Sequence, residues 1–344
     1  QNTDGLSESF PVPPDVIIQL AETVDEETLN QITPGLIKGW PNTYSFTKAL
    51  AEELIRTTAG DLPICIMRPT IVLNSYTEPL PGWTDLSCIT GPVGNVLGIG
   101  MGILHVCYTR PDLTLAFAPV DYVNNAALAA SWDAAERRRC GLSDVPIYTV
   151  SATRHGIKWK FFGDCLRSDE FVRLSTPKAV WYCCSLETEN RFIYWALTWL
   201  FHYIPAYMLD AVCTVLGIMP KGFPFTSFVK AYTLLYKVSM VYTYFLSNEW
   251  QFRDDNLQKM IERLSPEDRV IYNCDLGTVD YKELLKSCCI GLRQFIIKDG
   301  LKDTKYAYKK QKMLKYVNIL FLIIYFYMLW SIFRFVISTV AMVF

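Results

Sequence analysis

The chain has 344 residues and a mass of 39.4 kDa, which at about 150 residues per domain suggests two domains, or one large domain with an appendage. Hydrophobic residues make up 51% of the chain before its 18 glycines are counted. This apolar excess excludes a disordered chain and counts against a wholly soluble one. The 33 basic and 34 acidic residues give a net charge of −1, so no overall positive field favours nucleic acid.

Cysteine and histidine do not form a recognisable metal site in the sequence. Neither a Cys-x-x-Cys nor a His-Glu-x-x-His motif occurs among the 11 cysteines and 3 histidines. We therefore predict no metal centre. The odd cysteine count, without framework spacing, favours reduced, buried thiols in a protein that faces the cytosol.

The first elements in chain order form a helix–strand unit. Residues 1–42 are rich in proline and acids and predict a loop followed by a short helix near residues 25–32. Residues 43–58 combine helix formers with apolar side chains at helical spacing, and Gly60 follows as a C-terminal cap. Residues 62–67 read as a short buried strand. A helix that leads directly into a buried strand is typical of an α/β fold.

Glycine and proline dominate the next stretch, residues 73–110, which predicts loops. The glycines at 94, 98, 100 and 102 do not have the Gly-x-Gly-x-x-Gly spacing of a phosphate-binding loop. We interpret this stretch as the wall of a pocket. A helix at residues 124–132 and a strand at 147–150 follow, and beyond residue 155 helical patterns and aromatic residues dominate. We place a domain boundary there, giving domains at 1–155 and 156–310.

Two segments are apolar enough to contact a membrane. Residues 192–219 contain Asp210 as their only charged residue, but Pro205 and His202 interrupt the middle. Each half is too short to span a bilayer, which favours a helix pair that is buried or dips into the membrane interface.

The second apolar segment, residues 316–333, is uncharged and follows a basic stretch. Residues 298–315 carry seven lysines and two aspartates, a local charge of +5. Eighteen helical residues cover about 27 Å, close to the ~30 Å hydrocarbon core, and basic residues beside an apolar span mark the cytosolic side. We predict a single-pass C-terminal anchor at 316–335, with the preceding domains in the cytosol.

Tyr44 and Lys48 lie four residues apart on the predicted helix 43–58 and therefore share a face. A nearby ammonium favours the phenolate form of a phenol. Such a phenol can give its proton to a carbonyl oxygen as hydride arrives at the carbon, and the lysine can hold the ribose of a nicotinamide nucleotide. The motif is weak alone, but the following strand and Arg68-Pro69 strengthen it.

Several motifs resemble those of alcohol-forming fatty acyl-CoA reductases, which are extended short-chain dehydrogenases with a helical C-terminal domain. Residues 39–52 read Gly-Trp-Pro-Asn-Thr-Tyr-Ser-Phe-Thr-Lys-Ala-Leu-Ala-Glu, and residues 68–72 read Arg-Pro-Thr-Ile-Val. Pro-Gly-Trp-Thr-Asp at 81–85, Pro-Val-Asp-Tyr-Val at 119–123 and His-Tyr-Ile-Pro-Ala-Tyr at 202–207 continue the resemblance. The density of tyrosine and phenylalanine suggests an insect member.

The resemblance implies a fold, a reaction and a site. The fold is the C-terminal part of a Rossmann domain, followed by a helical domain and a transmembrane helix. The reaction is NADPH-dependent reduction of long-chain fatty acyl-CoA to a primary alcohol, as in wax synthesis. Tyr44 and Lys48 become the catalytic pair, and Lys48 with Pro69, Thr70 and Val72 contacts the cofactor. The protein sits on the endoplasmic reticulum or the peroxisome.

This sequence departs from the family pattern at its start. The glycine-rich phosphate loop and the strand with the catalytic serine are expected upstream of Gln1. We therefore expect the chain to be N-terminally truncated and, without the phosphate loop, not to bind NADPH with useful affinity. Two alternatives remain open. One is a membrane-bound steroid or nucleotide-sugar enzyme of the extended family. The other is a non-catalytic membrane-anchored interaction protein. The sequence does not indicate an oligomeric state.

Overall fold

The computed structural model describes residues 12–89, 91–217 and 227–343. The chain packs as two compact units, each made of three separate segments. Of the described residues, the first unit holds 12–72, 114–157 and 249–279, and the second holds the others. Residues 249–279 therefore pack with the first unit, although helical segments of the second unit flank them in sequence. The domain limits at 155 and 310 stay a prediction.

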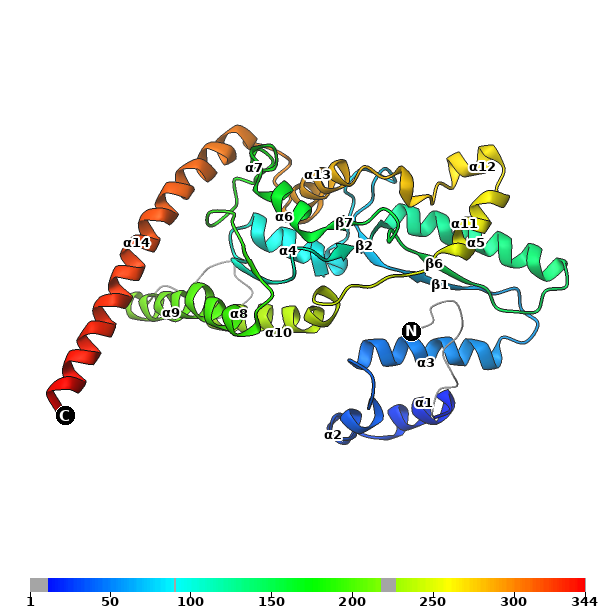
Figure 1. The fold of residues 1–344 in the computed structure, drawn as a ribbon, viewed down its shortest axis with the longest axis horizontal. Helices are drawn as coiled ribbons and strands as arrows, with labels where there is room; N and C mark the ends of the chain where they lie inside the picture. Colours follow the sequence, from blue (N-terminus) through cyan, green and yellow to red (C-terminus); the bar gives the residue numbers. More distant parts are fainter. Residues whose placement is uncertain (1–11, 90, 218–226, 344) are drawn as a thin grey trace. The chain divides into compact units, whose positions relative to one another are not determined.

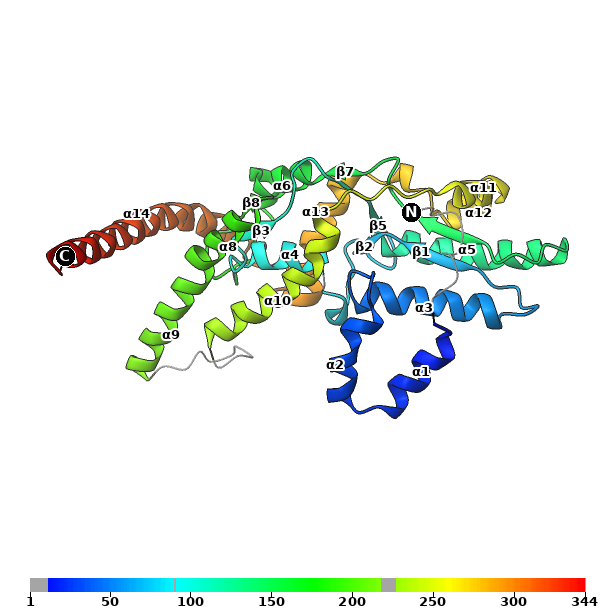
Figure 2. The same ribbon diagram turned by 60° about the horizontal axis from the view of Figure 1, so that its bottom comes forward.

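The first unit is built on a parallel strand pair covered by helices. Strand β1 (Ile66–Pro69) pairs with β6 (Ile147–Val150) in the register Ile66 to Ile147 and Pro69 to Val150. Helix α5 (Val120–Arg139) and helix α11 (Asp255–Arg263) pack against β6, and α3 (Thr43–Thr58) runs beside β1 (Figures 1 and 2). The other elements are α1 (Pro14–Thr23), α2 (Glu26–Leu36), β4 (Thr114–Leu115), β5 (Phe117–Pro119), α12 (Pro266–Ile271) and the 3₁₀ turn η3 (Leu276–Thr278); β2 (Ile71–Leu73) and β7 (Ile157–Lys158) lie where the units join in sequence.

The sequence-based elements of this unit are mostly confirmed, with shifted limits. The helix at 43–58 and the strand at 147–150 have the predicted bounds, and the helix near 25–32 is α2. Helix α1 lies where a loop was predicted. The strand predicted at 62–67 begins only at Ile66, because Pro63 lacks an N–H and Leu62 closes a turn on Ala59.

The second unit is mainly helical. Its only parallel pair among the described residues joins β3 (Val106–Tyr108) to β8 (Leu186–Thr188). Its helices are α4 (Gly91–Gly100), α6 (Trp159–Arg167), α7 (Asp169–Val172), α8 (Arg191–Thr198), the π-helical turn η2 (Trp199–Tyr203), α9 (Ile204–Leu216), α10 (Phe228–Leu246), α13 (Tyr281–Gly291), the π-helical turn η4 (Leu292–Ile297) and α14 (Thr304–Val343), with a 3₁₀ turn η1 (Leu86–Cys88).

Two segments of this unit differ from the sequence prediction. The glycine-rich stretch is not loop throughout, because residues 91–100 form α4, and Gly98 packs where an added Cβ would lie 3.0 Å from Leu104. Pro205 does not break the apolar segment at 192, because it directly follows the π-helical turn η2, in which Ile204 N donates to the Trp199 carbonyl, so the chain stays helical on both sides of the proline. The helix runs from Arg191 to Leu216 through η2. Residues 218 and 219 of the predicted segment lie outside the described part of the chain.

Close backbone contact and a buried ion pair hold the second unit together. Gly82 has φ +76° and touches Gly291 so closely that a Cβ on either residue would collide with backbone atoms. The buried Arg293 donates from Nε to Asp299 Oδ2 at 2.9 Å and from Nη1 to Thr304 Oγ1 at 3.0 Å. Thr304 is the first residue of α14, so this network fixes the start of that helix.

A buried carboxylate links three elements of the first unit. Asp133 of α5 is fully buried, accepts a hydrogen bond from the Tyr148 hydroxyl of β6, and lies 2.5 Å from Arg263 Nη2 of α11. Burial, with the bond to Asp133, raises the pKa of Tyr148 well above its usual range. The phenol therefore stays a neutral donor over the physiological range.

Substituting Asp133 by alanine should destabilise the first unit. The buried Tyr148 hydroxyl loses its acceptor and Arg263 loses its ion-pair partner, so we expect a loss of about 2 kcal/mol of unfolding free energy. Asp144→Ala is the matched control, because Asp144 pairs with Arg137 at the surface. Denaturant unfolding of the detergent-solubilised protein measures both, and equal losses in the two variants would contradict the assigned role of Asp133.

Candidate active site

The helix that carries Tyr44 and Lys48 is fixed by its cap and its apolar face. The Asn42 side chain accepts a hydrogen bond from Ser45 N at 2.9 Å and caps the first turn of α3. Phe46 and Leu50 are buried at the centre of a small cluster that includes Ile17, Ile37, Trp40 and Ala49. Because Phe46 and Leu50 face this cluster, Tyr44 and Lys48 are turned away from it.

Tyr44 and Lys48 are adjacent on the accessible side of α3. Tyr44 is 60% exposed, and Lys48 Nζ lies 5.8 Å from the centre of the phenol ring. This distance is within the range of a cation–π contact. The predicted i, i+4 geometry is therefore present, with both side chains accessible to a ligand.

A two-point ion pair joins this helix to the strand beside it. Arg68 at the end of β1 donates from Nε to Glu52 Oε1 at 2.8 Å and from Nη2 to Glu52 Oε2 at 2.6 Å. Glu52 follows Lys48 by one turn, so Tyr44, Lys48 and Glu52 follow one another along one side of α3. The Glu52–Arg68 pair thus turns the Tyr44/Lys48 side of the helix towards the carboxyl end of β1. The Arg-Pro motif indicated a strand end, but this partner was not visible in the sequence.

The predicted cofactor residues Pro69, Thr70 and Val72 lie at and just after the end of β1. Thr70 donates from both its backbone N and its Oγ1 to the carbonyl of Val150, at 3.0 and 3.1 Å. Val72 is exposed. The Thr70 side chain therefore braces the strand end, while Val72 offers an apolar surface at the edge of the sheet where open α/β folds bind ligands.

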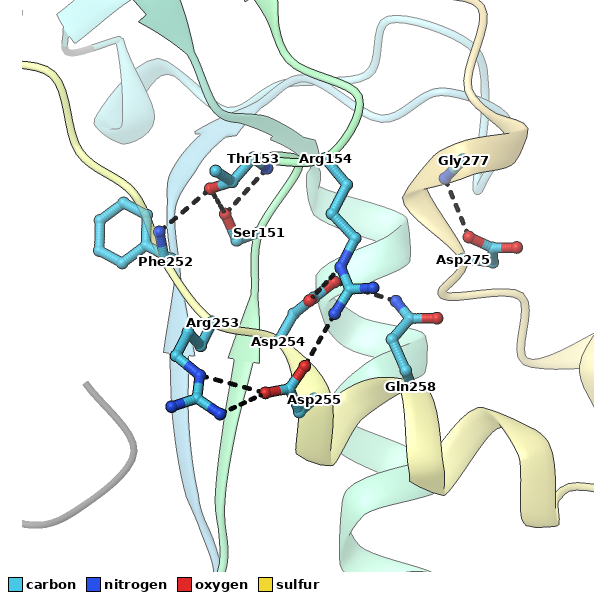
Figure 3. Close-up of polar contacts among 10 residues, drawn as sticks. All are labelled: Ser151, Thr153, Arg154, Phe252, Arg253, Asp254, Asp255, Gln258, Asp275 and Gly277. Atoms are coloured by element: carbon cyan, nitrogen blue, oxygen red, sulfur yellow. Dashed lines mark hydrogen bonds and ion pairs between the residues drawn. The ribbon is translucent and has the colours of Figure 1, made fainter. Parts of the chain in front are cut away.

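A second polar cluster follows β6 at the same edge (Figure 3). Arg154 donates to Asp254 Oδ1 at 2.6 Å and to Asp255 Oδ1 at 2.8 Å, and Thr153 Oγ1 accepts from Phe252 N at 3.3 Å. These bonds hold residues 252–255 against the strand end. Sequence reasoning did not identify this cluster, because its partners are about 100 residues apart.

The residues of this site fit one end of a nicotinamide nucleotide. An accessible phenol, an ammonium and the sheet edge suit a nicotinamide and its ribose. Among residues 12–89, 91–217 and 227–343, no strand enters a glycine-rich turn that opens a helix, so the described residues supply no cradle for the pyrophosphate.

Two of the buried cysteines are held in the thiol form. Burial raises the pKa of Cys107 and of Cys274 to about 12, which keeps both thiols protonated and unreactive. No group of three or more metal-ligating side chains occurs in the described part of the chain.

The chain is similar to proteins of one named group. Two family models, both described as male sterility protein, match residues 4–127, as an NAD-binding domain, and residues 201–299. The chain is 34% identical to fatty acyl-CoA reductase wat of Drosophila melanogaster over 304 residues, which is 87% of this chain and 56% of that protein. It is 30% identical to fatty acyl-CoA reductase 1 of Xenopus laevis and of Rattus norvegicus, each over 94% of this chain and 61% of the relative.

The fold and these matches define an NAD-binding domain of the extended short-chain dehydrogenase type, with a nicotinamide nucleotide as cofactor. The chain belongs to the fatty acyl-CoA reductase family. It spans between 56% and 61% of the length of the three relatives. Because these come from a fly, a frog and a rat, the similarity does not require the insect origin suggested by composition.

The Glu52–Arg68 pair should show measurable coupling. Because both side chains are about one quarter exposed, we expect a double-mutant cycle of Glu52→Gln and Arg68→Gln to give about 1 kcal/mol of coupling in unfolding free energy. The Glu53–Arg56 pair is a control within α3, three residues apart, and we expect weaker coupling there. If the coupling energy of Glu52 and Arg68 is no larger than that of Glu53 and Arg56, the Glu52–Arg68 pair does not hold α3 in place.

Proposed function

We propose that the protein reduces long-chain fatty acyl-CoA to a primary fatty alcohol with NADPH. The observation that carries the proposal is the Tyr44/Lys48 side of α3, held towards the end of β1 by Glu52 and Arg68. Family membership supports the acyl-CoA substrate and favours it over a steroid or a nucleotide sugar. The first reduction releases CoA and leaves an aldehyde, and the second converts the aldehyde to the alcohol.

Tyr44 and Lys48 have separate roles in this proposal. NADPH supplies a hydride to the carbonyl carbon when bound. Tyr44 gives its hydroxyl proton to the carbonyl oxygen, and Lys48 stabilises the phenolate that remains and donates to the ribose hydroxyls. Pro69, Thr70 and Val72 line the nicotinamide side, with Thr70 as a brace and Val72 as the exposed apolar contact.

An apolar pocket in the second unit is a candidate site for the acyl chain. Its apolar walls come from α4, from the α6–α7 region and from α13–η4, and they include Val96, Ile99, Leu166, Phe171, Leu292 and Ile297. The glycine-rich stretch that predicted a pocket wall provides the α4 side of it. A lining of this kind suits a hydrocarbon chain.

Replacing Tyr44 by phenylalanine should abolish most alcohol formation. The change removes one hydroxyl from an exposed ring, so the fold is retained while turnover falls by about 10²–10⁴-fold. The complete encoded polypeptide, given C16–C24 acyl-CoAs with NADPH or NADH, is assayed by identifying the products.

The control for this assay is Tyr272→Phe, which alters another partly exposed tyrosine of the first unit. Undiminished turnover in Tyr44→Phe would remove Tyr44 from the mechanism, and equal rates with NADH would contradict the preference for NADPH. A wild-type protein that makes neither aldehyde nor alcohol would favour the non-catalytic, membrane-bound alternative.

We further propose that α14 anchors the enzyme in the membrane of the endoplasmic reticulum or of the peroxisome. The residues before Lys315 would then lie on the cytosolic side. Among the described residues, Thr304–Thr339 is the one helical stretch long and apolar enough to cross a membrane. The charge of +5 over residues 298–315 supports this orientation. The site would then meet cytosolic acyl-CoA and NADPH.

Charges at the centre of α14 should release the protein from the membrane. Ile323 and Ile324 are exposed, and each aspartate placed there costs about 2.5–3.5 kcal/mol of insertion free energy. We expect the Ile323→Asp/Ile324→Asp variant to be extracted by alkaline carbonate, and the Ile323→Leu/Ile324→Leu control to stay in the pellet. A glycosylation acceptor site is inserted near Gly300 or appended after Phe344. Glycosylation of the site near Gly300, and not of the site after Phe344, would show that the orientation is the opposite of the one proposed.

A further inference from the structure

Helices α8 and α9 with the turn η2 form a continuous helical arm of the second unit, residues 191–216 (Figure 1). Many of the exposed side chains of this arm are apolar. Val215 is 85% exposed and Phe192 is 73% exposed. The exposed apolar side chains lie in two groups, at residues 192–199 and 207–216, separated by residues 200–206, which are buried or half-buried. The others that are more than one third exposed are Ile193, Trp195, Trp199, Tyr207, Met208, Leu209, Val212 and Leu216. Single exposed apolar side chains are common on protein surfaces, but a group of this size on one element indicates a binding surface.

Asp210 and His202, two polar side chains of the arm, have hydrogen-bond partners inside the protein. Asp210 is the only charged residue between 192 and 216, and its carboxylate accepts from Ser227 Oγ, Phe228 N and Val229 N at 2.6, 2.9 and 3.1 Å. The buried His202 accepts from His105 N at 3.0 Å through Nε2. Beyond the exposed Arg191 at its first position, the arm therefore presents no charged side chain without a partner, as a surface in lipid requires.

Contacts along one side of α14 attach it to the second unit, including the arm. Gln311 Nε2 donates to the Trp181 carbonyl at 3.1 Å, and Trp181 Nε1 donates to Asn318 Oδ1 at 2.7 Å. Further along, Tyr325 is 1% exposed and its hydroxyl donates to the carbonyl of Leu200 in η2 at 2.8 Å. The α14 helix is therefore docked on the protein as far as Tyr325.

This docking fixes the depth of the arm relative to the anchor. Tyr325 lies ten residues after Lys315 and nine before Arg334, near the centre of the uncharged stretch. If residues 316–333 fill the hydrocarbon core, η2 lies at the depth of Tyr325. The other placement, with immersion beginning after Tyr325, puts Arg334 at the centre of residues 326–343, where a charged side chain is costly. The charge pattern favours the first placement.

We propose that the arm at residues 191–216 is a second membrane-embedded element, immersed beside α14 with its outer face in the acyl chains of the bilayer. The inference rests on the proposed anchoring by α14 and is independent of the reductase activity. With residues 316–333 in the hydrocarbon core, the lysines that precede residue 316 lie at the level of the lipid headgroups, where they can bind anionic lipids. The enzyme would then hold its second unit partly within the layer where long acyl chains partition.

Photolabelling from the bilayer interior tests the proposal. The complete chain is reconstituted in vesicles of phosphatidylcholine with a minority of phosphatidylserine and a trace of phosphatidylcholine that carries a diazirine at the end of one acyl chain. After illumination and digestion, we expect labelled peptides from 192–216 as well as from 316–339. Val270 and Ile271 of α12 are also exposed and apolar, and this control segment should remain unlabelled.

The outcomes separate the arm from the anchor. Labelling of α14 without the arm, or equal labelling of α12, overturns the inference and leaves the anchor in place, whereas absence of label from α14 contradicts the anchor proposal itself. In a Val212→Lys/Val215→Lys variant, labelling of the arm should fall several-fold relative to a Val212→Leu/Val215→Leu control while α14 labelling persists. Unchanged labelling in the lysine variant would also count against immersion of this face.

Discussion

The parallel pairing of β1 with β6 is the constraint on which the first unit depends. It brings residues 66–69 beside residues 147–150, about 80 positions later in the chain. Thr70 continues the pairing by donating to Val150. Helices α5 and α11 then close on β6 through Asp133 and Arg263, and α3 is tied to the end of β1 through Glu52. The candidate site at this edge needs the pairing, because a strand end without its neighbour has no defined position.

In the second unit, a buried ion pair and a row of hydrogen bonds hold the long apolar helix α14 in a fixed position. The Arg293–Asp299 pair is buried on both sides and grips the first turn of α14. Polar side chains then recur on the docked face of the helix, at Gln311, Asn318 and Tyr325, and each has a partner in the unit. In a helix surrounded only by lipid such groups would lack partners. These hydrogen bonds therefore join α14, the proposed anchor, to the rest of the second unit.

Much of the geometry of the candidate site was predictable from the sequence, because it is local. Tyr44 and Lys48 are one helical turn apart, and the spacing alone puts them together. Pro69 and Thr70 were recognisable as a strand end. The Glu52–Arg68 brace and the cluster around Arg154 were not, because their partners are 16 and about 100 residues apart, and no periodicity records such pairs. The helical state of residues 91–100 was hidden by glycines, which are tolerated because Gly98 packs closely against Leu104.

The sequence by itself determined the α/β unit around residues 43–69, the Tyr44/Lys48 pair and the apolar C-terminal segment with its basic flank. Each of these depends on neighbours within a few turns of chain, where propensity and periodicity act. Tertiary structure alone decided that residues 249–279 pack with the first unit, that Pro205 continues a helix, and that Tyr325 is buried on η2. Those outcomes depend on which distant surfaces exclude water from one another, and a linear pattern of residue types does not specify that.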